Sequence, residues 1–174
     1  MKKTIICFGL GLFLYASTAF AGAGATIYGC LYVDTKPYSP VKITMKVGTN
    51  NHCVSKNANH AGKSYNLSIK SAGVSCVKIG YIEQKASSSG GDVCATDKSH
   101  WHLSYNADSD SFSWSGAADL RLNHPLFGSN HAEFNSKTSG TQLCNSASKC
   151  GTDKQQWDSG SVGNLYIVFD PSSS

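Results

Sequence analysis

The feature that most constrains the fold is an alternation of apolar and polar residues with a period of two. Val41–Val47 places Val, Ile, Met and Val on one side and Lys, Thr and Lys on the other, and Tyr65–Ile69 repeats the pattern. This alternation is typical of strands that bury one face of an antiparallel sheet. Similar short runs, expected to be strands, are Ala25–Val33, Val74–Glu83, Ser99–Tyr105, Ser111–Ser115 and Asn164–Phe169. We therefore predict an all-β protein, an antiparallel β-sandwich of about seven to eight short strands, with the apolar last strand central.

The beginning of the chain reads as a bacterial export signal. Two lysines precede a short apolar run, and Ala19-Phe20-Ala21 has the small-x-small pattern of a cleavage site. We predict that residues 1–21 are a signal peptide and that residues 22–174 form a single secreted domain. The mature part contains no second long apolar run, so no transmembrane segment is expected. The protein is expected to be secreted or periplasmic.

Cysteines support export to an oxidising compartment. Of seven cysteines, Cys7 leaves with the leader. The others are expected to pair as disulfides, because exported proteins oxidise their thiols. Cys144 and Cys150 enclose a few small or polar residues, and we predict that they pair with each other. The sequence leaves open how the rest pair; they are Cys30, Cys53, Cys76 and Cys94.

Two segments suggest where function could lie. A hairpin is expected in which Trp101, Leu103 and Tyr105 precede a turn at 106–110 and meet the rings of Phe112 and Trp114 on the core side. The opposite, polar face of this hairpin is a candidate binding strip, and its residues include His100, His102, Ser104 and Ser113.

The second segment is a long polar stretch, Asn123–Gly163, which is expected to be an irregular loop. It carries weak helix signals at Asn130 and Thr152. Its Trp157 is the aromatic residue that a core explains least well. We therefore consider it a candidate for contact with a sugar or a membrane, or alternatively a ring that packs the loop onto the domain.

The sequence provides little support for catalysis or nucleic-acid binding. The formal charge of the chain is only +4, and Arg121 is its single arginine, so phosphate recognition and nucleic-acid binding are not expected. No serine lies in a G-x-S-x-G motif. His100 and His102 have a spacing that could supply two metal ligands, with a third from His124, His131, Glu133 or Asp119. A polar strand face is the simpler interpretation, and no catalytic residue, metal or cofactor is assigned.

Several segments resemble the aegerolysin family of lipid-binding β-sandwich proteins. The matching pieces are Val41-Lys42-Ile43, the run from Ala61 to Tyr65, the aromatic hairpin around Trp101 and Trp114, and the run from Asp158 to Gly163. The resemblance implies a β-sandwich that recognises membrane lipids. The cysteines, the leader and the insertion after Asn123 depart from the family pattern, and no binding residue is transferred.

Together these features predict an exported, disulfide-stabilised, non-enzymatic binding protein, a secreted effector or virulence-associated factor that recognises a cell-surface or membrane component. The partner could be a membrane lipid, a glycan or a protein, and the oligomeric state is left open. One alternative is a periplasmic inhibitor or immunity-type protein that blocks an enzyme. Another is a metal-dependent hydrolase that uses His100 and His102.

Overall fold

The structure, a computed structural model, describes residues 24–48, 62–83, 99–109, 112–123, 129–136, 140–158 and 162–171. These residues form the predicted all-β fold, with ten strands, which is more than the sequence suggests. The strands are β1 (Gly24–Val33), β2 (Val41–Val47), β3 (Ser64–Ile69), β4 (Gly73–Glu83), β5 (Ser99–Ser109), β6 (Phe112–Asn123), β7 (Asn130–Ser136), β8 (Thr141–Cys144), β9 (Lys154–Trp157) and β10 (Gly163–Phe169). Within the described residues, no helix could cross a membrane.

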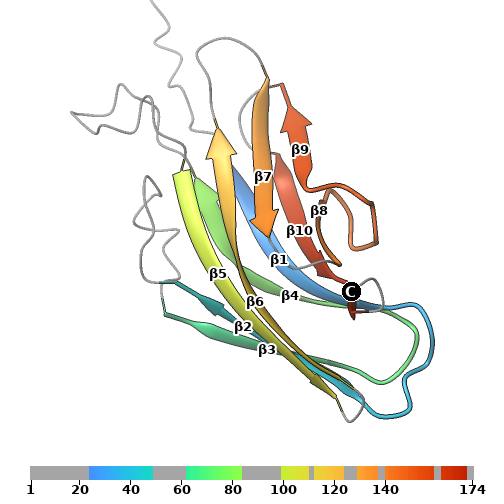
Figure 1. The fold of residues 1–174 in the computed structure, drawn as a ribbon. Coiled ribbons are helices and arrows are strands. Elements are labelled where there is room, and N and C mark those ends of the chain that lie inside the picture. Colours follow the sequence, from blue (N-terminus) through green and yellow to red (C-terminus); the bar gives the residue numbers. More distant parts are fainter. Residues whose placement is uncertain are drawn as a thin grey trace, which may run out of the picture.

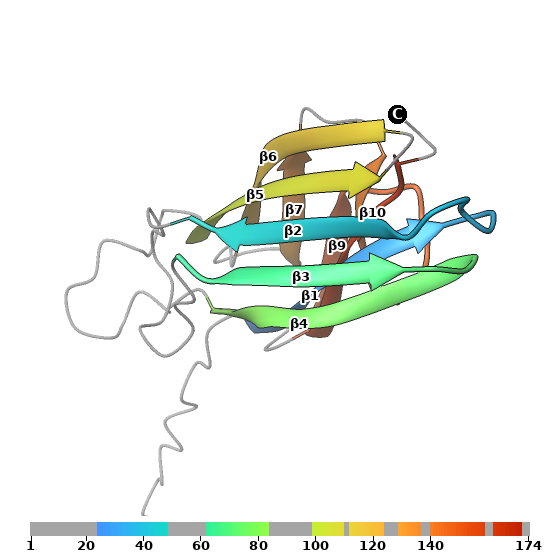
Figure 2. The same ribbon diagram turned by 90° about the horizontal axis from the view of Figure 1, so that it is seen from below.

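The strands form two sheets that pack as the predicted sandwich (Figures 1 and 2). One sheet has the order β4-β1-β10-β8 and the other has the order β3-β2-β5-β6-β7-β9. All neighbours are antiparallel except β1 and β10, which run parallel from Ala25↔Gly163 to Leu31↔Phe169. The prediction of an antiparallel sandwich is therefore correct except for this pair. A parallel pair needs a long connection, and nearly the whole described chain lies between these two strands.

The core lies between the sheets and follows the alternation in the sequence. In β2 every second residue is buried, from Val41 to Val47. β10 lies inside its sheet, as predicted, and its last residues are buried. The largest fully buried side chains are Phe134, Phe169, Ile27, Leu31, Ile43, Met45, Ile79, Ile82, Leu120 and Leu122. Burial of these apolar side chains is the main stabilising contribution to the sandwich.

The hairpin of β5 and β6 exists, but its predicted turn and pairing were wrong. Ser109 pairs with Phe112, so residues 106–109, which were predicted to lie in the turn, belong to β5. Trp101 lies opposite Leu120, whereas Trp114 lies opposite Ala107. Residues 106–109 continue the strand because all four pair with β6 and residues 106–108 also pair with β2.

The segment Asn123–Gly163 is not the irregular loop that the sequence predicts, because β7, β8 and β9 lie within it. The two helix signals were also wrong. Asn130 begins β7, whose Ala132 and Phe134 are buried in the core. Thr152 precedes β9, and its Oγ1 accepts a hydrogen bond from Lys154 N at 3.1 Å, a local turn that leads into the strand. Strand pairing here outweighs a weak local preference.

Candidate binding faces

The predicted polar strip lies on the six-stranded sheet, where the register locates each residue. His100 is opposite Arg121, His102 is opposite Asp119, and Ser104 is opposite Ala117. Ser113 is opposite Asp108. The strip therefore belongs to a sheet face whose described members are polar, including the hydrogen-bonded pair Thr44 and Asn66 on β2 and β3. This is the ordinary character of an outer sheet face in water.

The hypothetical metal ligands come from neighbouring strands of this sheet. Among the residues that the structure describes, there is no group of three or more His, Cys, Asp and Glu able to hold a metal ion. Arg121 lies in register between His100 and Glu133, and its guanidinium is 4.0 Å from the Asp119 carboxylate. A fixed cation at this position disfavours a second one nearby. His124 lies outside the described residues.

A small depression on the six-stranded sheet has a volume of about 220 Å³. Its charged groups alternate in sign, so it has no excess charge to attract an ion. Its volume is also below that of ordinary ligand pockets. The lining residues are Arg121, Glu133, Phe134, Asn135, Asp153 and Lys154.

Trp157 has a packing role. It ends β9 opposite the buried Asn130, and its half-buried ring packs against the main core. Of the two roles predicted for Trp157, ligand contact and packing onto the domain, the structure shows the packing role. Whether it also contacts a ligand remains a prediction.

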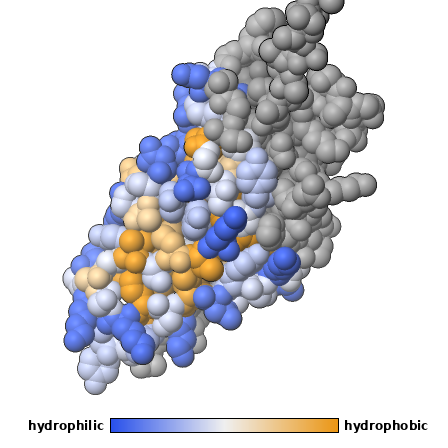
Figure 3. All heavy atoms as spheres, turned by 180° about the vertical axis from the view of Figure 1, so that it is seen from behind, coloured by the Kyte–Doolittle hydropathy of each residue, from blue (hydrophilic) through white to orange (hydrophobic). Residues whose placement is uncertain are grey.

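The outer face of the four-stranded sheet differs from that of the six-stranded sheet because it is aromatic. Its half-buried tyrosines are Tyr28 and Tyr32 on β1, Tyr81 on β4 and Tyr166 on β10, and we call these four residues the tyrosine face. Tyr28 and Tyr166 are directly in register, and their rings stack with centroids 5.1 Å apart and planes 20° apart. Hydrophobic residues gather in the middle of this side of the molecule, ringed by hydrophilic ones (Figure 3).

A disulfide is part of the tyrosine face, because Cys30 lies between Tyr28 and Tyr32 on the outer side of β1. Cys30 and Cys76 are directly opposite each other on β1 and β4 and are bonded, with their Cα atoms 4.1 Å apart. Cys30 is fully buried and forms a second apolar cluster with Cys144 and Val168, against which Tyr28, Tyr32 and Tyr166 pack. The covalent link joins β1 to β4 within this face, and the cluster gives the tyrosines an apolar surface to pack against.

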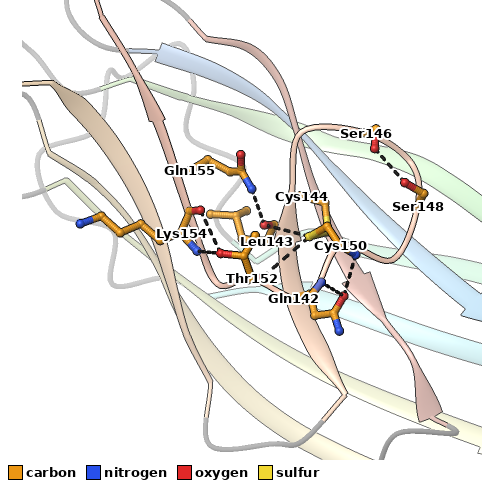
Figure 4. The surroundings of a disulfide bond; sticks show 10 residues. Gln142, Leu143, Cys144, Ser146, Ser148, Cys150, Thr152, Lys154 and Gln155 are labelled. Atoms are coloured by element: carbon orange, nitrogen blue, oxygen red, sulfur yellow. Dashed lines mark hydrogen bonds between the residues drawn. A yellow bond between two sulfur atoms is a disulfide. The ribbon is translucent and has the colours of Figure 1, made fainter.

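A second disulfide, Cys144–Cys150, closes a loop at one side of the same face (Figure 4). This is the pairing that the sequence predicts. Gln142 Oε1 accepts hydrogen bonds from the backbone N–H groups of Cys150 and Gly151, both at 3.0 Å. Ala147, inside the loop, packs against the same apolar cluster as the tyrosines. The disulfide loop, residues 144–150, therefore borders the tyrosine face along β8 and β10.

Lys149 anchors this loop to the end of β10. Its ammonium lies 2.6 Å from the carboxylate of Asp170, whose side chain is fully buried, while the lysine side chain is 45% exposed. The hydrogen bond to Asp170 raises the pKa of Lys149 above its usual value. A buried carboxylate is stable only when it is paired and hydrogen-bonded.

We predict that Lys149→Met lowers the melting temperature at neutral pH by roughly 5 °C, because Asp170 loses its cation. The raised pKa means that the ion pair contributes fully below pH 10.5, the usual lysine value, and is lost as the pH rises through the pKa of the folded state. The difference from the wild type should therefore vanish in strong alkali. Thermal melts from pH 7 upward test this, with the exposed Lys42→Met as the control. Equal melting temperatures of the wild type and Lys149→Met at neutral pH would show that the Lys149–Asp170 ion pair does not stabilise the fold.

The disulfides bear directly on the predicted cysteine pairing. The structure selects Cys30–Cys76 among the pairings that the sequence leaves open and confirms Cys144–Cys150. Cys53 and Cys94 lie outside the described residues. Two disulfides are consistent with an exported protein, since they persist in oxidising compartments.

The tyrosine face was not identified from the sequence. Tyr166 joins Tyr28 and Tyr32 on this face only through the parallel pairing of β1 and β10, which local sequence patterns do not reveal.

Comparison of the chain with protein-family models, curated proteins and solved structures gave no match. The resemblance to aegerolysins therefore stays an untested prediction.

Proposed function

We propose that this is an exported, disulfide-stabilised binding protein, secreted or periplasmic, that recognises a component of a cell surface through its tyrosine face. The observation that carries the proposal is the stacked, half-buried pair Tyr28 and Tyr166 on the outside of a sheet. Tyrosine is enriched at protein binding surfaces because its rigid ring supplies contact area and its hydroxyl supplies a hydrogen bond.

The proposal moves the contact surface away from the strip that the sequence suggests. The described outer residues of β2 and β3 are lysine, threonine, serine and asparagine, which solubility alone explains. An outer face with half-buried tyrosines against an apolar cluster is harder to explain by solubility. No observation on the described residues favours the inhibitor or hydrolase alternatives.

A lipid bilayer is a poorer partner for this surface than a polar molecule. Among the residues whose burial the structure describes, which excludes residues 99–118, the exposed large hydrophobic side chains are Tyr38 and Val74. Insertion into a membrane needs a larger exposed apolar area. We therefore favour recognition of surface groups over insertion into the bilayer.

The test is binding of the labelled mature protein to intact cells and to isolated cell envelopes. We expect Tyr28→Ala combined with Tyr166→Ala to weaken binding at least tenfold, because the stacked pair is removed from the centre of the contact. The matched control is Thr44→Ala with Asn66→Ala, which removes a contacting cross-strand pair from the other sheet.

Circular dichroism must show that both double variants keep the β fold. Equal binding by the wild type and the tyrosine variant would refute the tyrosine face as the contact surface. Failure of the wild type to bind any cell or envelope would refute the proposed function.

A further inference from the structure

The tyrosine face carries a charge pattern that narrows its ligand, and this inference rests on the proposed function. Lys78 on β4, Tyr28 on β1 and Tyr166 on β10 are consecutive partners in the register, so an ammonium and two aromatic rings form one row across three strands. Lys78 is exposed. Asn164 Nδ2 lies 3.5 Å from Tyr166 Oη, which adds an amide at the end of the row.

Lys78 gives this row a positive charge. On the outer face of β4 and β1, the described residues around Lys78 are Tyr28, Cys76 and Tyr81, none of which is acidic. The carboxylate at the end of β10, Asp170, is fully buried and bonded to Lys149 at 2.6 Å. A ligand that covers the row therefore meets an exposed ammonium, and none of the described side chains next to Lys78 is a carboxylate that would repel an anionic group.

The aromatic rings, hydroxyl groups and amide of this row are groups that bind sugars. The C–H face of a pyranose packs on an aromatic ring, and its hydroxyl groups exchange hydrogen bonds with tyrosine hydroxyls and amides. A carboxylate or sulfate on the sugar would form a charge-assisted hydrogen bond with the lysine. A rigid sheet surface suits an extended polymer, because little ordering is needed on the protein side when it binds.

We propose that the row of Lys78, Tyr28 and Tyr166 binds an acidic polysaccharide, with its sugar rings against the tyrosines and an acidic group at Lys78. The disulfide loop borders the row on the β10 side, where Ala147 packs against the apolar cluster. The polymer therefore crosses β4, β1 and β10, on the side of the tyrosine face away from the disulfide loop.

The experiment measures binding of the mature protein to three named polymers: polygalacturonate, heparin and uncharged dextran. We expect binding to one or both acidic polymers, weakening as salt is added, and none to dextran. Lys78→Gln and Tyr28→Ala should each lower the affinity at least tenfold. Lys42→Gln, at an exposed lysine of the other sheet, should leave it unchanged.

Polygalacturonate carries carboxylates only, whereas heparin carries both carboxylates and sulfates, so binding to heparin alone would identify sulfate as the required group. Equal binding to dextran, or an equal loss of affinity in Lys42→Gln, would overturn the inference, because binding would then be nonspecific. Absence of binding to both acidic polymers would also overturn it.

A second measurement separates this inference from the proposed function. Cells that bind the protein are treated either with periodate, which cleaves sugar diols, or with protease. Binding lost after periodate and retained after protease supports a glycan ligand. Binding that depends on the tyrosines, survives periodate and is lost after protease would leave the proposed function intact and overturn the acidic glycan.

Discussion

Replacing Cys30 and Cys76 together by alanine is expected to lower the free energy of unfolding by about 4 kcal/mol. The two cysteines are separated by 46 positions, so their bond removes a large loop from the unfolded ensemble. Cys30 is also fully buried, and alanine would leave a small cavity between Tyr28 and Tyr32. At roughly 2–4 °C for each kcal/mol, the melting temperature should fall by about 10 °C. Urea denaturation followed by tryptophan fluorescence measures the loss.

The control is the other described disulfide, because Cys144 and Cys150 are only 6 positions apart. Their double replacement should cost about 2 kcal/mol in the same loop-entropy model. If the short loop costs as much as the long one, chain entropy is not the main contribution of these bonds. The Cys30 and Cys76 variant should also bind its surface partner more weakly, since Tyr28 and Tyr32 flank Cys30 on the same face.

The strands located best from the sequence are those with a run of at least five residues that are apolar or alternate between apolar and polar. β2 matches its predicted run residue for residue, and β1, β3, β4 and β10 agree within one residue at each end. In β2 the buried residues recur at every second position, so the pattern in the sequence and the burial in the structure are the same property.

Sequence patterns missed β7, β8 and β9; β8 and β9 are short and lie at sheet edges, whereas β7 has 7 residues and lies inside its sheet. β9 has four residues, Lys154–Trp157, and lies at an edge, so only its Gln155 and Trp157 face inward. Two inward residues are too few to define a period. β8 is equally short, and its Cys144 was assigned to a disulfide loop rather than to a strand. These strands form because neighbouring strands pair with them. The residues of a short sequence segment do not reveal such pairing.

The candidate site depends on contacts between distant parts of the chain. Tyr28 and Cys30 are near the start of the domain, Cys76 is on β4, and Tyr166 is near the end of the domain. Each residue type was visible in the sequence, but their assembly required the parallel pairing of β1 with β10 and the antiparallel pairing of β1 with β4. Local patterns predict strands much better than they predict which strands become neighbours.

The second large effect on stability is expected where the two sheets approach each other closely. Gly29 of β1 faces the core, and a Cβ atom built there would overlap the Sδ and Cε atoms of Met45 on β2. Met45 is fully buried, so its side chain has little room to move away. We therefore expect Gly29→Val to destabilise the protein by about 3 kcal/mol through overpacking, although valine is the better strand former.

Met45→Ala alone should cost about 2–5 kcal/mol, because it leaves a cavity between the sheets. In the double variant the valine occupies part of the space that the methionine leaves. Its loss of stability should therefore be smaller than the sum of the two single losses by at least about 1 kcal/mol. Urea denaturation of the wild type, both single variants and the double variant gives this coupling energy. Additive losses would mean that Gly29 and Met45 are not in contact, and the close approach of β1 to β2 would then be wrong.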